Sequence, residues 1–217
     1  MYNITLIFTH HGDLGEKCNS DELYKIIKSI NPEVIFWEFP AVLFDMLCKE
    51  EGHSNYTPET KTFKWLLQNS SIKHFPVDID SNPNLSFDEI ENTFKKYHVY
   101  KNLIDDIQNG IELDGYTFLN SKKCEKLYEE KKIMEKKFLR FIGFTGLIHM
   151  YKLFYEEVDD REYAIIKNIY NHSKENQYNH GVLIIGAAHR PSLKQKIKEH
   201  KTKEKLKLNW IFDHFEK

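Results

Sequence analysis

The sequence has 217 residues, of which 41% are hydrophobic and 14% aromatic, enough for one domain with a ring-rich core. Its 31 Lys and Arg residues against 33 Asp and Glu residues leave a net charge of −2, so the bulk charge predicts neither a nucleic-acid partner nor a membrane partner. Cys18, Cys48 and Cys124 form no CxxC pair, and we expect reduced thiols. The N-terminus resembles a strand rather than a secretion signal, and no apolar run approaches the ~20 residues of a membrane span. We therefore expect a soluble cytoplasmic protein.

The first forty residues predict a strand–helix–strand unit. Residues 4–8 and 34–37 are short, largely apolar runs with β-branched side chains, typical of strands. Between them, Asn19 and Glu22 have the spacing of a capping box, and apolar residues then recur at helical intervals until Pro32. Because such crossovers are right-handed and join parallel strands, we expect the two strands to be parallel and close together in the sheet.

The periodicity of apolar residues predicts the later elements. Pro76 would remove a ladder hydrogen bond, so its strand is expected at an edge. The stretch from about 84 to 157 is predicted to be a helical insertion between two halves of a mostly parallel sheet. The expected fold is α/β, in one domain spanning 1–217. The expected elements are helix over 41–69 with a polar break at 52–58, strand 72–77, helices 87–107 and 121–157, a helix beginning at 159–161, and strand 206–212.

Residues 182–193 carry the most informative pattern in the chain. Val182-Leu-Ile-Ile185 is typical of a strand that is buried on both faces in a parallel sheet. Gly186-Ala-Ala ends this strand with small residues that suit a tight turn or the close approach of another group. Pro191 is well suited to the first turn of a helix. His189 is therefore expected at the carboxyl edge of the sheet, where open α/β sheets bind their ligands.

Four polar residues, His11, Glu38, Asp78 and His189, each follow a predicted strand. If the strands are parallel, all four side chains gather on one rim of the sheet. Two imidazoles and one or two carboxylates match the ligand types of a hydrolytic Zn²⁺, Mn²⁺ or Co²⁺ site. The same residues could work without metal, with a histidine taking a proton from water while a carboxylate orients it.

Each of these residues, taken singly, also has a simpler structural explanation. A histidine after a strand is often a helix cap or a turn residue, and Asp78 has the residue type of an N-cap. Glu38 could form a salt bridge with a nearby lysine. Arg161 stands beside two aspartates, and its default interpretation is a surface ion pair. Four such residues at four strand ends are harder to explain in this way than any one of them.

Four short motifs occur in a defined order along the chain. The first and last are GxxH-type motifs after strands, although Phe8 replaces the glycine in the first. Both His10 and His11 therefore stay open as the site histidine, with Gly12 favouring His11. The motifs are Phe8-Thr-His-His11, Pro32-Glu-Val-Ile-Phe-Trp-Glu38, Asp159-Asp-Arg161 and Gly186-Ala-Ala-His189.

This ordered set resembles the TraB/PrgY/TIKI superfamily, which also includes ChaN-like and erythromycin-esterase-like proteins. The resemblance covers residues 4–40 and 159–193. It implies a compact α/β fold with His11, Glu38 and His189 in one pocket. The pocket of the TIKI branch is similar to a metal-dependent peptidase site, whereas in the esterase branch a histidine and a glutamate activate water without metal.

We therefore expect a hydrolase that cleaves an amide or ester bond in a small-molecule or peptide substrate. His11, Glu38 and His189 would bind a divalent metal such as Zn, Mn or Co, or would activate water directly. Asp78 would orient a ligand or take part in proton transfer. Arg161 would stabilise an oxyanion or hold a substrate carboxylate or phosphate. The first alternative is a non-catalytic protein that binds a small ligand or peptide in the same pocket. The second is an interaction protein in which the helical insertion carries the function and the pocket is vestigial.

Overall fold

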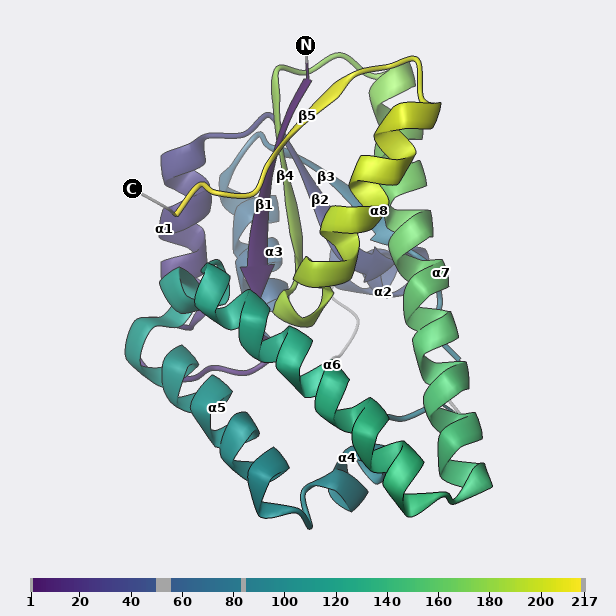
Figure 1. The fold of residues 1–217 in the computed structure, drawn as a ribbon. Coiled ribbons are helices and arrows are strands. Elements are labelled where there is room, and N and C mark those ends of the chain that lie inside the picture. Colours follow the sequence, from purple (N-terminus) through teal and green to yellow (C-terminus); the bar gives the residue numbers. More distant parts are fainter. Residues whose placement is uncertain (1, 50–55, 83–84, 216–217) are drawn as a thin grey trace.

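A computed structural model describes residues 2–49, 56–82 and 85–215. Its five strands form one parallel sheet in the order β3-β2-β4-β1-β5, which confirms the α/β prediction. Helices flank this sheet (Figure 1). The elements are β1 (Tyr2–Thr9), α1 (Ser20–Ile30), β2 (Val34–Pro40), α2 (Ala41–Cys48), α3 (Pro58–Asn69), β3 (Lys73–Asp78), α4 (Asp88–Phe94), α5 (His98–Leu119), α6 (Lys122–Ile142), α7 (Thr145–Glu175), β4 (His180–Gly186), the short 3₁₀ turn η1 (Ala187–His189), α8 (Arg190–Lys203) and β5 (Leu208–Ile211).

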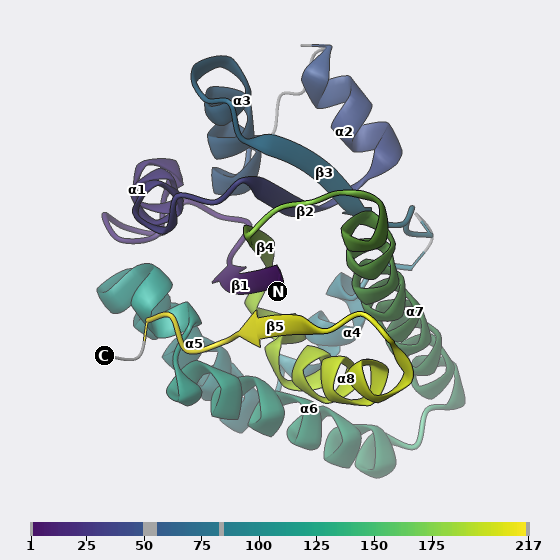
Figure 2. The ribbon, with the colours of Figure 1, turned by 90° about the horizontal axis from the view of Figure 1, so that it is seen from above.

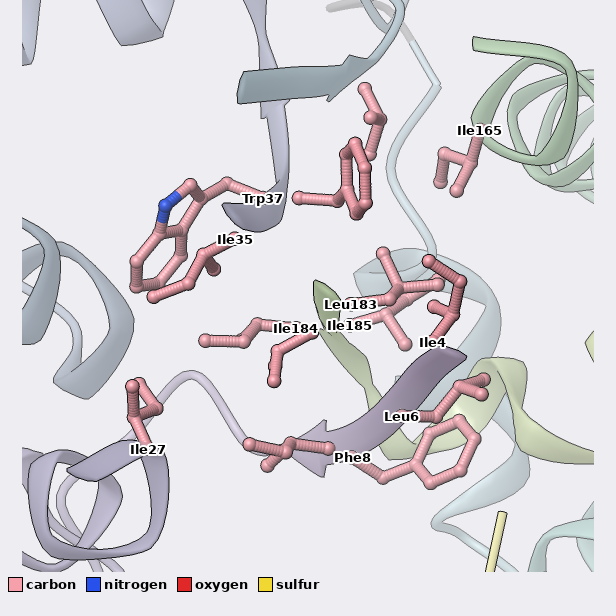
Figure 3. Packing of buried hydrophobic residues seen from close by; sticks show 14 of the residues in the cluster. Ile4, Leu6, Phe8, Ile27, Ile35, Trp37, Ile165, Leu183, Ile184 and Ile185 are labelled. Carbon is pink, nitrogen blue, oxygen red and sulfur yellow. The ribbon is translucent and has the colours of Figure 1, made fainter. Parts of the chain in front are cut away.

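The central strands are buried on both faces, as their unbroken apolar sequences predict. Alternate residues face opposite sides of the sheet, so Ile184 lies with Trp37 toward Ile27 of α1, whereas Leu183 lies toward Ile165 of α7 (Figure 3). Seen from above, α1 and α3 cover one face of the sheet and α7 and α8 cover the other (Figure 2). The side chains named above are all at most 2% exposed: Ile27, Trp37, Ile165, Leu183 and Ile184.

The order of the strands places a late strand between the first two. β1 and β2 are parallel, but β4 lies between them and pairs with both. The strand that carries the second GxxH-type motif therefore separates the two strands of the first crossover unit. β3 lies at one edge, where Pro76 was expected, and β5 lies at the other. Part of the predicted polar break at 52–58, residues 52–55, lies outside the described residues.

The helical region between β3 and β4 is divided differently from the prediction. The single helix expected over 87–107 is wrong, because Tyr97 is extended and separates α4 from α5. Gly143 adopts φ +65° and ends α6, whereas a bend within one long helix was expected. The helix start predicted at 159–161 is also wrong. These residues lie in the middle of the 31-residue α7, where Asp159 pairs with Lys196 instead of capping a helix.

The helices α4 to α7 have a hydrophobic cluster of their own, beyond the end of the sheet (Figure 1). Asn120, at the end of α5, joins this part to the sheet. β5 pairs only with residues 2–5 of β1, so it does not reach Phe8. The Asn120 side chain instead bonds both the N–H and the C=O of Phe8, at 2.9 and 3.0 Å. In the described part of the chain, no helix has the length and apolar character that crossing a bilayer requires.

Candidate active site

The predicted site residues lie together at the carboxyl end of the parallel sheet. His11 follows β1, Glu38 lies near the end of β2, Asp78 ends β3, and His189 lies in the turn after β4. Arg161 approaches them from the middle of α7. The expectation that parallel strands deliver these groups to one rim is borne out by the contacts between them.

Glu38 is the centre of the cluster. The backbone N–H of Gly186 donates to its Oε2 at 2.7 Å, and Arg161 Nη2 donates to its Oε1 at 3.1 Å. His189 Nε2 lies 3.1 Å from the same Oε1. Burial alone would raise the pKa of Glu38, but the positive charge and hydrogen bond of His189 outweigh it and lower the pKa to about 2. Glu38 is therefore a carboxylate at any physiological pH.

His189 lies between two carboxylates. Its Nδ1 is 2.6 Å from Glu162 Oε1, and its Nε2 contacts Glu38. Burial would lower its pKa, yet the two carboxylates raise the pKa of His189 to about 10, so the ring is an imidazolium at neutral pH. Glu162 is fully buried and also accepts hydrogen bonds from Ser192 at 2.7 Å and Lys196 at 2.6 Å.

Arg161 joins two strand ends through one guanidinium group. Its Nε donates to both oxygens of Asp78, at 3.2 and 3.1 Å, and its Nη2 bonds Asp78 and Glu38. The interpretation of Arg161 as a surface ion pair is therefore wrong, since its side chain is 22% exposed and those of Asp78 and Glu38 are 2% and 8% exposed. Asp78 holds the guanidinium group of Arg161, and its own side chain is 2% exposed.

His11 is the accessible imidazole of the cluster. Its side chain is 67% exposed, and its Nδ1 lies 3.2 Å from Oε1 of the buried Glu59. That carboxylate raises the pKa of His11 above its ordinary value of 6.5. His10 lies elsewhere. Its Nδ1 accepts from the N–H of Gly12 at 3.1 Å, and its ring lines a separate cavity beside α5. Of the two histidines, His11 is the one beside Glu38.

Two observations define a small polar space between His11 and Glu38. A Cβ placed on Gly186 would lie 3.6 Å from Glu38 Oε2 and 3.7 Å from His11 Nε2, so both atoms face the space above this glycine. Nearby is a cavity of about 10 Å³, roughly the size of one water molecule, lined by His11, Glu38, Glu59 and Thr9. Thr9 Oγ1 is buried there without a hydrogen-bond partner among the described residues.

The arrangement does not fit the three-ligand metal site formed by His11, Glu38 and His189. In the residues that the structure describes, no group of three or more His, Cys, Asp or Glu side chains is placed to hold a metal ion. The reason lies in His189, whose two ring nitrogens both contact carboxylates and which turns Cδ2 toward the space above Gly186. An imidazolium has no lone pair for a metal. Of the three atoms nearest to that space, His11 Nε2 and Glu38 Oε2 are the two that could donate electrons to a metal.

The sequence analysis missed two members of the cluster, Glu59 and Glu162. Glu59 lies in the first turn of α3, after the N-cap Thr57, where an acidic residue is ordinarily explained by the helix dipole. Glu162 directly follows Arg161, and the expected helix start drew attention to Asp159 instead. Both glutamates pair with a site histidine through Nδ1, which leaves Nε2 to face the centre of the site. The signal that could have identified Glu59 and Glu162 is an acidic residue at a helix position that is predicted to be buried.

No known protein-family model matches this sequence, and neither a curated protein nor a solved structure gives a match. The resemblance of its motifs to the TraB/PrgY/TIKI superfamily therefore stays a prediction. What the cluster can do follows from its own geometry: an accessible imidazole oriented by a buried carboxylate, a second carboxylate opposite it, and two partly buried cations.

Proposed function

We propose that the protein is a hydrolase of ester or amide bonds in which His11 activates water directly. The observation that carries this proposal is the small space into which His11 Nε2 and Glu38 Oε2 both face, beside a cavity of about 10 Å³. Glu59 fixes the other nitrogen of the imidazole. A histidine oriented by a carboxylate, with its second nitrogen toward water, is a common form of general base.

In the proposed reaction, a water molecule between His11 and Glu38 attacks the carbonyl carbon of the substrate. His11 Nε2 accepts the proton of the water as the new C–O bond forms. Glu38, with a pKa of about 2, is too weak a base to compete for this proton, so its role is to orient the water through a hydrogen bond. The bond from the carbonyl carbon to the leaving oxygen or nitrogen then breaks, and His11 returns the proton to that leaving atom. The products are a carboxylic acid and an alcohol or amine, and His11 is neutral again.

The negative charge that develops on the carbonyl oxygen needs donors that are already in place. Arg161 and His189, whose side chains are 22% and 12% exposed, are the cations beside Glu38, and both line the larger cavity. Arg161 Nη1 has no acceptor in the part of the chain that the structure describes, so it can donate to the oxyanion. Asp78 and Glu162 act through these cations as positioning residues.

The same hydrolysis could instead be metal-assisted. In this second version, Zn, Mn or Co is held by His11, Glu38 and His189. It requires His189 to lose its proton and release Glu38, which the pKa of about 10 opposes. Elemental analysis of the purified protein, together with turnover in the presence of a chelator, separates the two versions. We expect turnover that a chelator does not abolish.

The central test is turnover of 4-nitrophenyl esters and fluorogenic amides by the protein and its His11→Ala variant. We expect the substitution to lower kcat/KM by about 10² to 10⁴-fold, because general-base catalysis contributes on that order. His10→Ala is the matched control, since His10 is the sequence neighbour that faces a different cavity. Equal losses in both variants, or none in His11→Ala, would contradict the proposal.

A binding protein is the second candidate, and one observation favours it. A cavity of about 480 Å³ adjoins the site, within the range of cavities that enclose small organic ligands. The ion pairs of Glu38, Arg161 and His189 would then serve only to hold the wall of this cavity. Saturable binding of a ligand that the protein never turns over would identify this function.

A further inference from the structure

The cavity of about 480 Å³ lies between α6 and α7 and is closed by the turn that leads into α8. Arg161 and His189 form the part of its lining that belongs to the proposed active site. His189 contacts Glu38 at 3.1 Å, so the cavity borders the proposed site through His189 and Arg161, while His11 and Glu38 themselves line the smaller cavity. The chemistry of the rest of the lining therefore selects the substrate of the proposed reaction.

Lysines of α6 supply positive charge to the lining. Lys131 is already neutralised, since its Nζ lies 2.9 Å from Glu135 and 3.3 Å from Glu91. Lys132 and Lys136 have no carboxylate partner within ion-pair distance among the described residues. They are four residues apart, so both extend from the same face of the helix. Two ammonium groups without an ion-pair partner in the described part of the chain thus face one cavity.

Lys132 is the more enclosed of the two. Its Nζ lies 4.3 Å from the centre of the Tyr155 ring, a cation–π contact across the cavity between α6 and α7. Burial lowers its pKa, so the ammonium group lacks full hydration and gains from an anion. The only acidic side chain that lines the cavity in the described residues is Glu129, which is exposed.

The remainder of the lining is apolar and rich in rings. Such a surface binds the hydrocarbon part of a ligand, while the charged groups fix its orientation. A free inorganic anion would leave most of this surface uncovered, and a purely apolar molecule would leave the lysines without a partner. The apolar and aromatic lining residues include Phe87, Ile133, Phe154, Tyr155, Val158 and Pro191.

We infer that the substrate is an organic anion: an ester or amide with an apolar body and, apart from the bond to be cleaved, a carboxylate or phosphate group that pairs with Lys132 and Lys136. This inference rests on the proposed function, because Arg161 and His189 place the cleaved bond at the other part of the same cavity. The lysines select the substrate and orient it, and His11 and Glu38 perform the hydrolysis.

The inference is tested by measuring the turnover of three 4-nitrophenyl esters whose acyl chains have the same number of carbon atoms. 4-Nitrophenyl hexanoate is neutral, the 4-nitrophenyl monoester of adipic acid carries a carboxylate, and the corresponding 6-phosphohexanoate ester carries a phosphate. We expect kcat/KM to be at least tenfold higher for one or both anionic esters, and their ratio distinguishes carboxylate from phosphate. The variant Lys132→Gln/Lys136→Gln should reduce this preference at least tenfold, whereas Lys137→Gln, an exposed neighbour outside the cavity, should retain it.

Binding provides a readout that does not depend on turnover. 1-Anilinonaphthalene-8-sulfonate and N-phenyl-1-naphthylamine share one ring system, and only the first is an anion. We expect the anion to bind at least tenfold more tightly, and the Lys132→Gln/Lys136→Gln variant to lose this difference. Equal binding of the two probes, or an unchanged difference in that variant, overturns the inference. Selective binding without turnover of any ester overturns the proposed hydrolysis and supports the anion site.

Discussion

At the scale of single residues, the proposed chemistry depends on three polar groups that are each held by a partner from another element. Glu59 of α3 holds His11, Gly186 of β4 holds Glu38, and Glu162 of α7 holds His189. The reacting groups therefore need no reorganisation when a substrate binds. Such preorganisation is the main source of electrostatic catalysis. The arrangement also means that removing His189 would leave Glu38 with Arg161 and Glu162 with Lys196 as their remaining cations, so its deletion tests stability as well as chemistry.

Gly186→Ala is a cleaner test of the site. Gly186 has φ −57° and ψ 139°, which alanine adopts without strain, and the new Cβ would meet Glu38, His189 and His11 at ordinary contact distances of 3.6 to 3.7 Å. The methyl group would nonetheless fill the space between His11 Nε2 and Glu38 Oε2. We expect an unchanged melting temperature and a loss of about 10²-fold in kcat/KM. Full activity in a folded Gly186→Ala protein would show that no reacting atom occupies this space.

The pH dependence of kcat/KM follows from two histidines with opposite roles. The base, His11, works when neutral, so activity rises with pH through its raised pKa, above 6.5. His189 works when protonated, so activity falls as pH rises through about 10. Glu59→Gln removes the carboxylate that raises the pKa of His11, and it should move the rising limb to lower pH while reducing the maximum rate. A rising limb that keeps its position in Glu59→Gln would mean that another group is the base.

Sequence reasoning identified the residues at the strand ends because a parallel sheet brings the carboxyl ends of its strands to one edge. His11, Glu38, Asp78 and His189 all have this position. It could not identify Glu59 and Glu162, because both lie on helices, where the sequence does not reveal which face turns toward the site. Asp78 was expected to orient a ligand or take part in proton transfer, and the contact that the structure gives it in the site is the pair with Arg161.

At the scale of elements, a single buried carboxylate ties together the helices that form the large cavity. Glu135 of α6 is fully buried and accepts hydrogen bonds from Tyr100 of α5 at 2.9 Å, and from Tyr151 and Tyr155 of α7 at 3.1 and 3.0 Å. Lys131 neutralises it. The two walls of the cavity, α6 and α7, are therefore held at a fixed separation by polar contacts as well as by packed rings.

Glu135→Ala should cost about 3 kcal/mol of unfolding free energy, because it leaves three tyrosine hydroxyls in a partly apolar setting without an acceptor. Glu135→Gln, which keeps an acceptor oxygen but not the charge, should cost less. Glu130→Ala, at an exposed position of the same helix, should change stability by less than about 0.5 kcal/mol. Urea denaturation measures all three. Similar losses for Glu135→Ala and Glu130→Ala would show that the tyrosine contacts contribute nothing to stability.

The helix boundaries in this region show where periodicity alone was insufficient. Apolar residues recur every three or four positions on both sides of Tyr97, so the interruption between α4 and α5 leaves the pattern intact. The pair Asp159-Asp160 has the composition of a helix N-terminus, yet packing of Ile165 and Tyr151 at opposite ends of α7 carries the helix through it. Tertiary contacts, which a single sequence does not display, decided both boundaries.

At the scale of the whole molecule, the ion pairs at the sheet edge join β2, β3, α7 and the turn after β4, so folding and ionisation are linked. The pKa of Glu38 is lowered from 4.5 to about 2, and its contribution to stability is present above pH 4.5 and is lost as pH falls toward 2. The pKa of His189 is raised from 6.5 to about 10, and its contribution is present below pH 6.5 and is lost as pH rises through 10. Between pH 4.5 and 6.5 both contributions are complete.

We therefore expect the unfolding free energy to be greatest in that interval and to fall on both sides of it. Between pH 5.5 and pH 3, the shift of Glu38 alone accounts for a loss on the order of 2 kcal/mol. The Glu38→Gln protein, although less stable at pH 5.5, should lose that much less over the same range. Glu22→Gln, which removes a surface pair with Lys25, should keep the wild-type slope. Urea unfolding at pH 3, 5.5 and 9.5 measures these differences, and equal acid slopes for wild type and Glu38→Gln would show that Glu38 titrates in the folded protein as it does in the unfolded chain.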